Sequence, residues 1–145
     1  MSYIDDLIDI AIKEDIGDGD HTSLSCIPKE AKGKAHLLVK EDGVLAGVDI
    51  SNKIFYNIYS EILFEQFLND SDTINIGDIA FTVEGSSQSI LQAERLALNF
   101  MQRMSGIATN TNYYVNLLEG TNTKVLDTRK TTPGLREIEK LAVKI

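Results

Sequence analysis

The stretch VLDTRKTTPGLR, from Val125 to Arg136, predicts the end of a strand, a loop and the start of a helix. Its first two residues finish a short apolar run, and the threonines, proline and glycine that follow are typical of turns and helix caps. In parallel α/β sheets and barrels, ligands bind where the strands end, because the next helix directs its free N–H groups there. Arg129 and Lys130, beside Thr128, therefore form a candidate anion site.

These side chains suit phosphate or carboxylate. Arg129 offers a planar fork of donors, Lys130 a mobile point charge, and Thr128 a hydroxyl group. Neither the P-loop spacing nor GxGxxG occurs in the chain, which excludes the usual nucleotide cradles. The same residues also fit a solvated loop leading into a helix, so their chemistry alone leaves both interpretations open.

The charge of the chain is unevenly distributed, although its net value is −8. Residues 1–94 carry 18 acidic residues and 6 lysines, whereas residues 95–145 carry 4 acidic residues, 4 lysines and all 4 arginines. Since arginine favours bidentate recognition of carboxylate and phosphate, an anion site is expected late in the chain. The acidic body would repel a nucleic-acid backbone, so nucleic acid is not expected as a partner.

Length and composition indicate about one globular domain, because 43% of the 145 residues are hydrophobic. Cys26 is the single cysteine, which excludes an intramolecular disulfide and a multi-cysteine metal site. No apolar run reaches the roughly 18 residues of a membrane span, and the start MSYIDDLIDI is acidic where an export signal would be basic. We therefore expect a cytoplasmic protein without a membrane partner.

The longest helical pattern begins at Ser86 or Ser87 and continues to Leu118, with an expected break or kink at 105–106. Its polar face is narrow and carries Arg95. An arginine on such a helix needs either a protein carboxylate or a ligand. A short strand at 124–126 and a last helix at 135–143 follow. No cap residue ends that helix and its apolar face has nothing downstream to pack against, so we expect the front part of a longer protein.

Residues 1–84 predict a small antiparallel sheet with helices on one face, an α+β layer. The expected helices are 2–13, with a capping box of Ser2 and Asp5, and 49–59, with Asp49 or Ser51 as N-cap. The expected strands are 34–40, 44–48, 61–67 and 79–83, the first two strands forming a hairpin. The stretch EDIGDGDHTS, residues 14–23, is expected to be a loop. Calcium binding there is disfavoured because the bidentate glutamate of an EF-hand is missing.

Three separated motifs resemble quinolinate phosphoribosyltransferase in the order in which that family has them. They are EDIGDGDHTS (14–23), AERLALNFMQRMSGIAT (93–109) and LDTRKTTPGLREIEKLAVK (126–144). The resemblance implies an α+β fold with an N-terminal open-faced sandwich of antiparallel sheet and helices over residues 1–104. The first βα unit of a truncated α/β barrel would follow over residues 105–145.

The resemblance also implies a glycosyltransferase that converts quinolinate and phosphoribosyl pyrophosphate, with Mg²⁺, into nicotinate mononucleotide, pyrophosphate and carbon dioxide in NAD biosynthesis. Arg129 and Lys130, with Thr128, would line the quinolinate pocket. Arg95 would reach the partner's site in a homodimer. The family's other pocket residues and its acidic residues linked to ribose and Mg²⁺ would lie beyond Ile145. We therefore expect no metal ligand in this chain, assign no catalytic residue and expect the fragment alone to be inactive.

Two alternatives stay open at this point. A homologous phosphoribosyltransferase-like protein of molybdate transport has similar motifs. The chain could instead be a non-catalytic anion-binding module that is complete as it stands.

Overall fold

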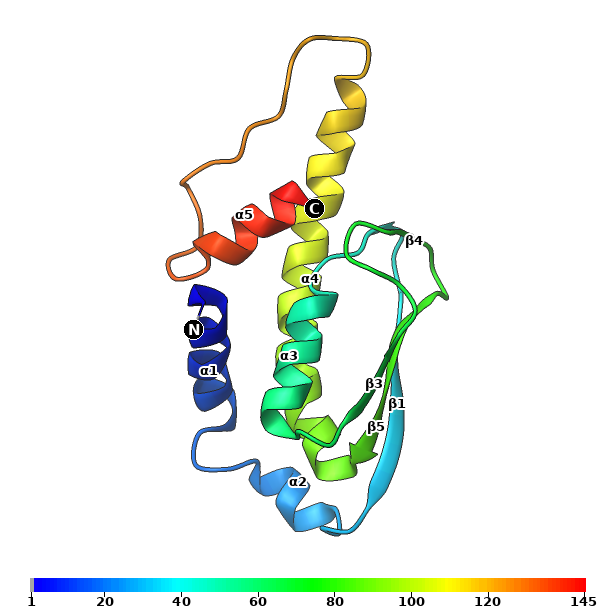
Figure 1. Cartoon of the computed structure of the whole chain (residues 1–145), viewed down its shortest axis with the longest axis vertical. Helices are drawn as coiled ribbons and strands as arrows, with labels where there is room; N and C mark the ends of the chain where they lie inside the picture. The colour runs from blue at the N-terminus through cyan, green and yellow to red at the C-terminus, as the bar shows by residue number, and fades with distance from the viewer. Residues whose placement is uncertain (1) are drawn as a thin grey trace.

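The computed structural model describes residues 2–145 and shows helices packed on one side of a small antiparallel sheet (Figure 1). The helices are α1 (Tyr3–Ile16), α2 (His21–Cys26), α3 (Val48–Ile58), α4 (Ser87–Leu117) and α5 (Arg136–Lys144). The strands are β1 (Lys32–Leu38), β2 (Gly43–Val44), β3 (Leu63–Gln66), β4 (Thr73–Ile74) and β5 (Ile79–Ser86). The expected α+β class is confirmed, whereas the barrel and the division at residue 104 stay predictions.

The sheet pairs strands that are distant in the sequence. Its order is β1-β5-β3, with every pair antiparallel, and β2 pairs separately with β4. The predicted hairpin between residues 34–40 and 44–48 is therefore wrong. Strand β5 lies in the centre of the sheet, in agreement with the burial of its Ala80, Phe81 and Val83. By contrast β1 has an alternating pattern in which Lys32 and Lys34 are exposed, and it lies at an edge.

Helix α4 is the longest element and crosses the whole molecule (Figure 1). Its 31 residues span about 46 Å. The Ser86 side chain accepts a hydrogen bond from Ser89 N, which confirms Ser86 as the N-cap. The expected break at residues 105–106 is wrong. Ser105 Oγ instead accepts a bond from Ala46 N at 3.0 Å and donates to Ala46 O at 3.1 Å, which fastens the middle of the helix to the chain before α3.

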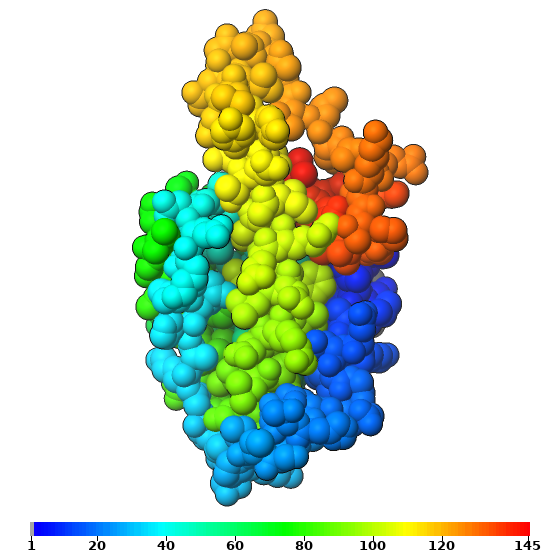
Figure 2. Space-filling view, turned by 180° about the vertical axis from the view of Figure 1, so that it is seen from behind, coloured from blue at the N-terminus to red at the C-terminus, as the bar shows by residue number. Residues whose placement is uncertain are grey.

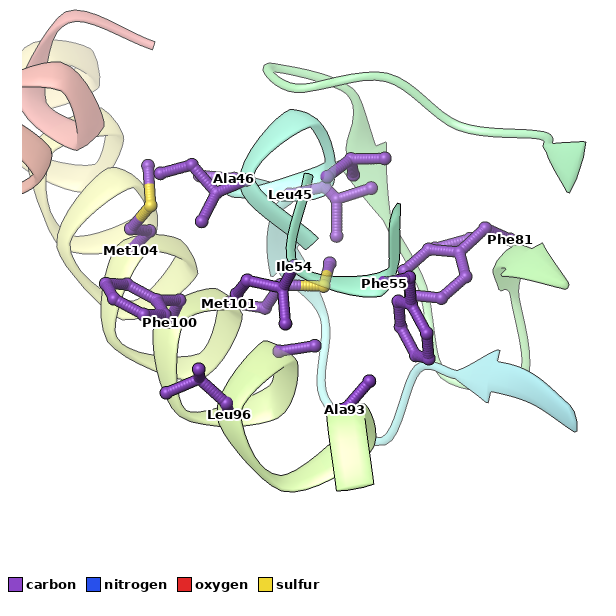
Figure 3. Packing of buried hydrophobic residues seen from close by; sticks show 14 of the residues in the cluster. Leu45, Ala46, Ile54, Phe55, Phe81, Ala93, Leu96, Phe100, Met101 and Met104 are labelled. Carbon is purple, nitrogen blue, oxygen red and sulfur yellow. The ribbon is translucent and has the colours of Figure 1, made fainter. Parts of the chain in front are cut away.

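The hydrophobic core lies between α3, α4 and the sheet, and Figure 3 shows Ile54 of α3 close to Met101 of α4. Phe55, Phe64 and Phe81 pack ring against ring with centroid distances of 4.5 to 6.2 Å. Phe55 and Phe81 belong to the core and are 3% and 2% exposed. The aromatic side chains of Tyr56 and Phe67, by contrast, are about half exposed.

Helix α5 packs against α4 and α1. Ile138 and Ala142 are 1% and 0% exposed, so the apolar face of α5 is covered within this chain rather than unpaired, as the sequence had suggested. Between α4 and α5 the chain has no strand. The predicted strand at 124–126 is wrong, since no other strand lies beside it and Leu126 is 85% exposed.

Several helix ends differ from the expected ones because distant groups supply the caps. Helix α1 has the predicted capping box of Ser2 and Asp5. The expected loop at 14–23 shrinks to four residues between α1 and α2, and Asp20 caps α2 by accepting from Ser23 N. Helix α3 begins after Gly47, not at Asp49 or Ser51. Asp70 Oδ1 accepts from the first N–H of α3 at 2.8 Å, so a residue 22 positions away replaces a local cap.

The Asp5 carboxylate provides a test of this packing. Lys53 Nζ of α3 lies 2.7 Å from Asp5 Oδ1, and this hydrogen bond, with those from Ser2, lowers the pKa of Asp5 from 3.8 to about 2. A lowered folded-state pKa stabilises the fold above pH 4, and that contribution is lost as the pH falls through about 2. Carboxyl NMR titration should give a pKa near 2, rising toward 3.8 in Lys53→Gln. An unchanged pKa in that variant would contradict the contact.

Candidate functional site

The candidate anion residues lie on the segment that joins α4 to α5. Thr128, Arg129 and Lys130 are all exposed on an extended stretch without helix or strand. Lys130 N donates to Thr128 Oγ1 at 3.1 Å, a local turn-type contact. Within residues 2–145 neither the Arg129 nor the Lys130 side chain has a hydrogen bond or an ion pair to the protein. Both cations are therefore available to a ligand.

Side chains hold this segment onto α5. Lys140 Nζ lies 2.9 Å from Asp127 Oδ2, and Arg136 Nε donates to Thr131 Oγ1 at 3.3 Å. Farther along, Tyr3 Oη of α1 donates to the backbone oxygen of Gly134 at 2.9 Å. Figure 2 shows the segment against α5 and above α1. The sequence predicted the cations of the segment but none of these anchors.

A second set of contacts joins the segment to α4. Arg103 Nε donates to Glu139 Oε1 at 2.8 Å, and Arg103 Nη2 donates to the same oxygen and to Thr132 Oγ1. Thr132 N donates to the other carboxylate oxygen, Glu139 Oε2, at 3.3 Å. Neither Arg103 nor Glu139 was among the predicted site residues, although both lie in the motifs 93–109 and 126–144 that resemble the family.

Arg95 of α4 is paired with a carboxylate of this chain. Its Nε and Nη2 donate to the two oxygens of Asp15 at 2.7 and 3.0 Å, a bidentate pair that joins α4 to the end of α1. The hydrogen bond to Asp15 raises the pKa of Arg95, and the nearby Asp20 acts in the same direction. The Arg95 side chain is nevertheless 59% exposed. Of the two partners that the sequence left open, the structure shows the carboxylate.

The chain does not bring Arg95 together with Arg129 and Lys130. Arg95 contacts α1 at Asp15, near its end, whereas the segment contacts α1 at Tyr3, its first residue. Twelve helical residues separate the two contacts, about 18 Å along the axis. Arg95 and the segment are thus attached to opposite ends of α1.

Metal ligands do not gather in the part of the chain that the structure describes. No group of three or more His, Cys, Asp or Glu side chains there is placed to hold an ion. His21 Nε2 lies 3.3 Å from Asp18 Oδ1, a local contact within the turn before α2. None of the helices between residues 2 and 145 has the length and apolar character needed to cross a bilayer.

Comparison with protein families gives two adjacent matches that cover most of the chain. The quinolinate phosphoribosyl transferase N-terminal domain matches residues 20–105, and the C-terminal domain of the same family matches residues 107–145.

Individual relatives agree. The chain is 43% identical over 140 residues to quinolinate phosphoribosyltransferase [decarboxylating] 1b of Nicotiana tabacum, covering 96% of this chain and 39% of the relative. It is 41% identical to the chloroplastic nicotinate-nucleotide pyrophosphorylase [carboxylating] of Oryza sativa subsp. japonica, covering 96% and 37%. The chain thus spans about two fifths of the length of these relatives.

Solved structures give the same result. NadC from Streptococcus pyogenes superposes with a TM-score of 0.93 at 40% identity, covering 97% of this chain and 50% of that one. The nicotinate-nucleotide pyrophosphorylase from Francisella tularensis gives 0.91 at 34% identity, covering 98% and 51%.

Proposed function

Because this chain belongs to the quinolinate phosphoribosyltransferase family, we propose that it supplies part of an enzyme that transfers phosphoribose to quinolinate. Quinolinate and phosphoribosyl pyrophosphate would give nicotinate mononucleotide, pyrophosphate and carbon dioxide, a step of NAD biosynthesis. The observation that supports this function best is the exposed pair Arg129 and Lys130, free of protein partners within residues 2–145 and placed on an anchored segment.

The chemistry of this pair matches the substrate. Quinolinate carries two adjacent ring carboxylates. Arg129 can bind one of them with two parallel hydrogen bonds, and Lys130 can bind the other. Each hydrogen bond to a charged group contributes about 1.5–3 kcal/mol. Holding the ring in this way would direct its nitrogen toward the sugar donor. The contribution of these residues to catalysis would be positioning and charge stabilisation.

We also propose a homodimer in which Arg95 reaches the partner's site. Asp15 uses Nε and Nη2 of Arg95, so the two N–H groups of Nη1 remain for an anion. The exposed position of Arg95, together with its distance from the segment in its own chain, suits a residue that serves a second copy. Asp15 would keep the guanidinium group oriented while it does so.

The proposed reaction includes Mg²⁺, which would accompany the sugar donor. The described residues include no cluster fit to bind it, so we assign it no ligand in this chain and derive no step from it. The cytoplasmic location also stays a prediction.

The direct test uses the full-length protein that contains this chain. With phosphoribosyl pyrophosphate and quinolinate labelled in the carboxyl group at ring position 2, we expect release of labelled carbon dioxide together with nicotinate mononucleotide. Turnover of nicotinate without turnover of quinolinate would refute the proposed substrate. Absence of any transfer, with measurable anion binding, would favour a non-catalytic module. Location of the gene among molybdate transport genes would favour the other homologue.

Replacing Arg129 in this enzyme should show which side chain holds the substrate. For Arg129→Ala we expect kcat/KM for quinolinate to fall about 10- to 100-fold, the equivalent of about one charged hydrogen bond. Lys124→Ala is the matched control, because Lys124 is an exposed cation on the same connection but outside the motif. Equal losses in both variants would indicate a general effect of positive charge and would contradict a specific contact.

A further inference from the structure

The segment that carries the candidate anion residues has almost no backbone support of its own. From residue 122 to residue 131, no backbone N–H in the described structure bonds to a backbone oxygen. Ordering a residue costs about 1–2 kcal/mol of backbone entropy, so side-chain anchors must offset that cost here. The anchors determine how well Arg129 and Lys130 are positioned.

The strongest anchor is the contact between Arg103, Glu139 and Thr132. The Glu139 side chain is only 11% exposed, and it uses both oxygens, one for Arg103 and one for the backbone N–H of Thr132. The Arg103 guanidinium closes the arrangement by donating to the Thr132 hydroxyl. The hydroxyl group and the backbone N–H of Thr132 are thus both hydrogen-bonded to side chains. Thr132 lies two residues from Lys130 and three from Arg129.

Burial makes the loss of either partner in this contact costly. A carboxylate as buried as that of Glu139 is costly without a cation, and loss of one partner leaves the other uncompensated. Burial raises the pKa of Glu139, but the hydrogen bonds from Arg103 and Thr132 outweigh it and leave the pKa below its usual value. The group is therefore charged at neutral pH. The pair of Lys140 and Asp127 at the other end of the segment is 42% and 38% exposed, where ion pairs contribute little.

We propose that Arg103 and Glu139 are positioning residues: they hold Thr132, and through it the segment, in the conformation that presents Arg129 and Lys130 to an anion. Glu139 is not offered to the ligand, because its two carboxylate oxygens are taken by Arg103 and by the backbone N–H of Thr132. Arg103 holds the segment through Nε and Nη2. The role in substrate binding rests on the proposed function. The role in ordering the segment does not.

Limited digestion of the full-length protein with trypsin tests the ordering. Trypsin cleaves after Arg129 and Lys130, so its rate there reports how often the segment leaves its position. For Glu139→Gln we expect cleavage at these two sites to rise about fivefold or more, the effect of a loss of 1 kcal/mol or more. Cleavage after Lys40, in the exposed turn after β1, should stay constant and so exclude global unfolding.

Matched variants sharpen the result. Glu84→Gln removes an ion pair with Lys34 on the sheet, far from the segment, and should leave cleavage after Arg129 and Lys130 unchanged. Arg103→Lys keeps the charge but not the fork, and should give an intermediate rate. The double variant Arg103→Gln with Glu139→Gln should not exceed the larger single effect, because both substitutions break the same contact. If Glu139→Gln does not fold, Arg103→Lys carries the test.

Kinetics of the full-length enzyme test the role in binding. We expect Glu139→Gln to raise KM for quinolinate, and Arg103→Lys to raise it less, in proportion to the fall in the fraction of correctly placed segment. KM for phosphoribosyl pyrophosphate should stay nearly constant. A purely structural role would change neither value after correction for active enzyme.

The outcomes separate the two proposals. Faster cleavage after Arg129 and Lys130 in a protein that never turns over quinolinate would support the ordering role and refute the proposed function. Quinolinate turnover with unchanged cleavage and unchanged KM in both variants would refute the positioning role and leave the proposed function intact. Equal acceleration after Lys40 would also refute the positioning role, since the effect would then be global.

Discussion

Replacing Ile54 with alanine is expected to lower the free energy of unfolding by about 2–5 kcal/mol. Ile54 is 0% exposed and lies between α3 and α4, close to Met101 (Figure 3). The shorter side chain would lose its transfer free energy and leave a cavity that two packed helices cannot fill by collapsing. Urea unfolding followed by circular dichroism measures the loss.

Ile10 provides the matched control for this prediction. It has the same side chain on α1 but is 62% exposed, so Ile10→Ala should change stability by no more than about 0.5 kcal/mol. Similar losses for both isoleucines would mean that α3 and α4 do not form the core as described.

Replacing Gly47 with alanine is expected to cost about 2–5 kcal/mol of stability. The φ angle of Gly47 is +98°, where a side chain adds strain of about 1–2 kcal/mol. An added Cβ would also lie 3.2 Å from Met104 Sδ and 3.3 Å from Met101 Cα. The sulfur can shift but the backbone of α4 cannot, so overpacking adds about 1–3 kcal/mol.

Gly77→Ala separates the two parts of that cost. Gly77 has nearly the same angle, +99°, but nothing lies within 4 Å of the added Cβ. Its substitution should therefore cost only the strain, about 1–2 kcal/mol. Equal losses at both positions, in the same urea experiment, would show that close packing of Gly47 on α4 contributes nothing.

Elements with a complete local pattern could be predicted from the sequence. Helix α1 has its capping box and apolar repeat within a single stretch, and α5 has an apolar face that is visible without any partner. The N-cap of α4 was predicted for the same reason. In each case the information lies within a few residues of the element that it determines.

Elements that depend on distant partners could not be predicted. The pairing of β1 with β5 joins Lys32 to Ser86, and nothing in either segment specifies the other. The continuity of α4 through Ser105 depends on Ala46, and the start of α3 depends on Asp70. Local residues there indicated a break or a different cap, and tertiary contacts decided otherwise.

The candidate site likewise combines residues that the sequence predicts with residues that it does not. Thr128, Arg129 and Lys130 were found because cations and threonines stand together in one motif. Arg103 and Glu139 are 36 residues apart and meet only because α5 packs on α4. Arg95 and Asp15 are 80 residues apart. The groups that offer charge to a ligand are thus local in sequence, whereas the groups that hold them are not.

Because α4 is continuous, it fixes the distance between Arg95 and Arg103. Arg95 and Arg103 are eight residues apart on one continuous helix, which places their backbones about 12 Å apart. One arginine is fastened to α1, and the other is fastened to the segment with Arg129 and Lys130. A hinge between them would require breaking helical hydrogen bonds. Arg95 and Arg103 therefore keep this separation as long as α4 stays helical, so the contact with α1 and the contact with the segment are held at a fixed distance along the helix.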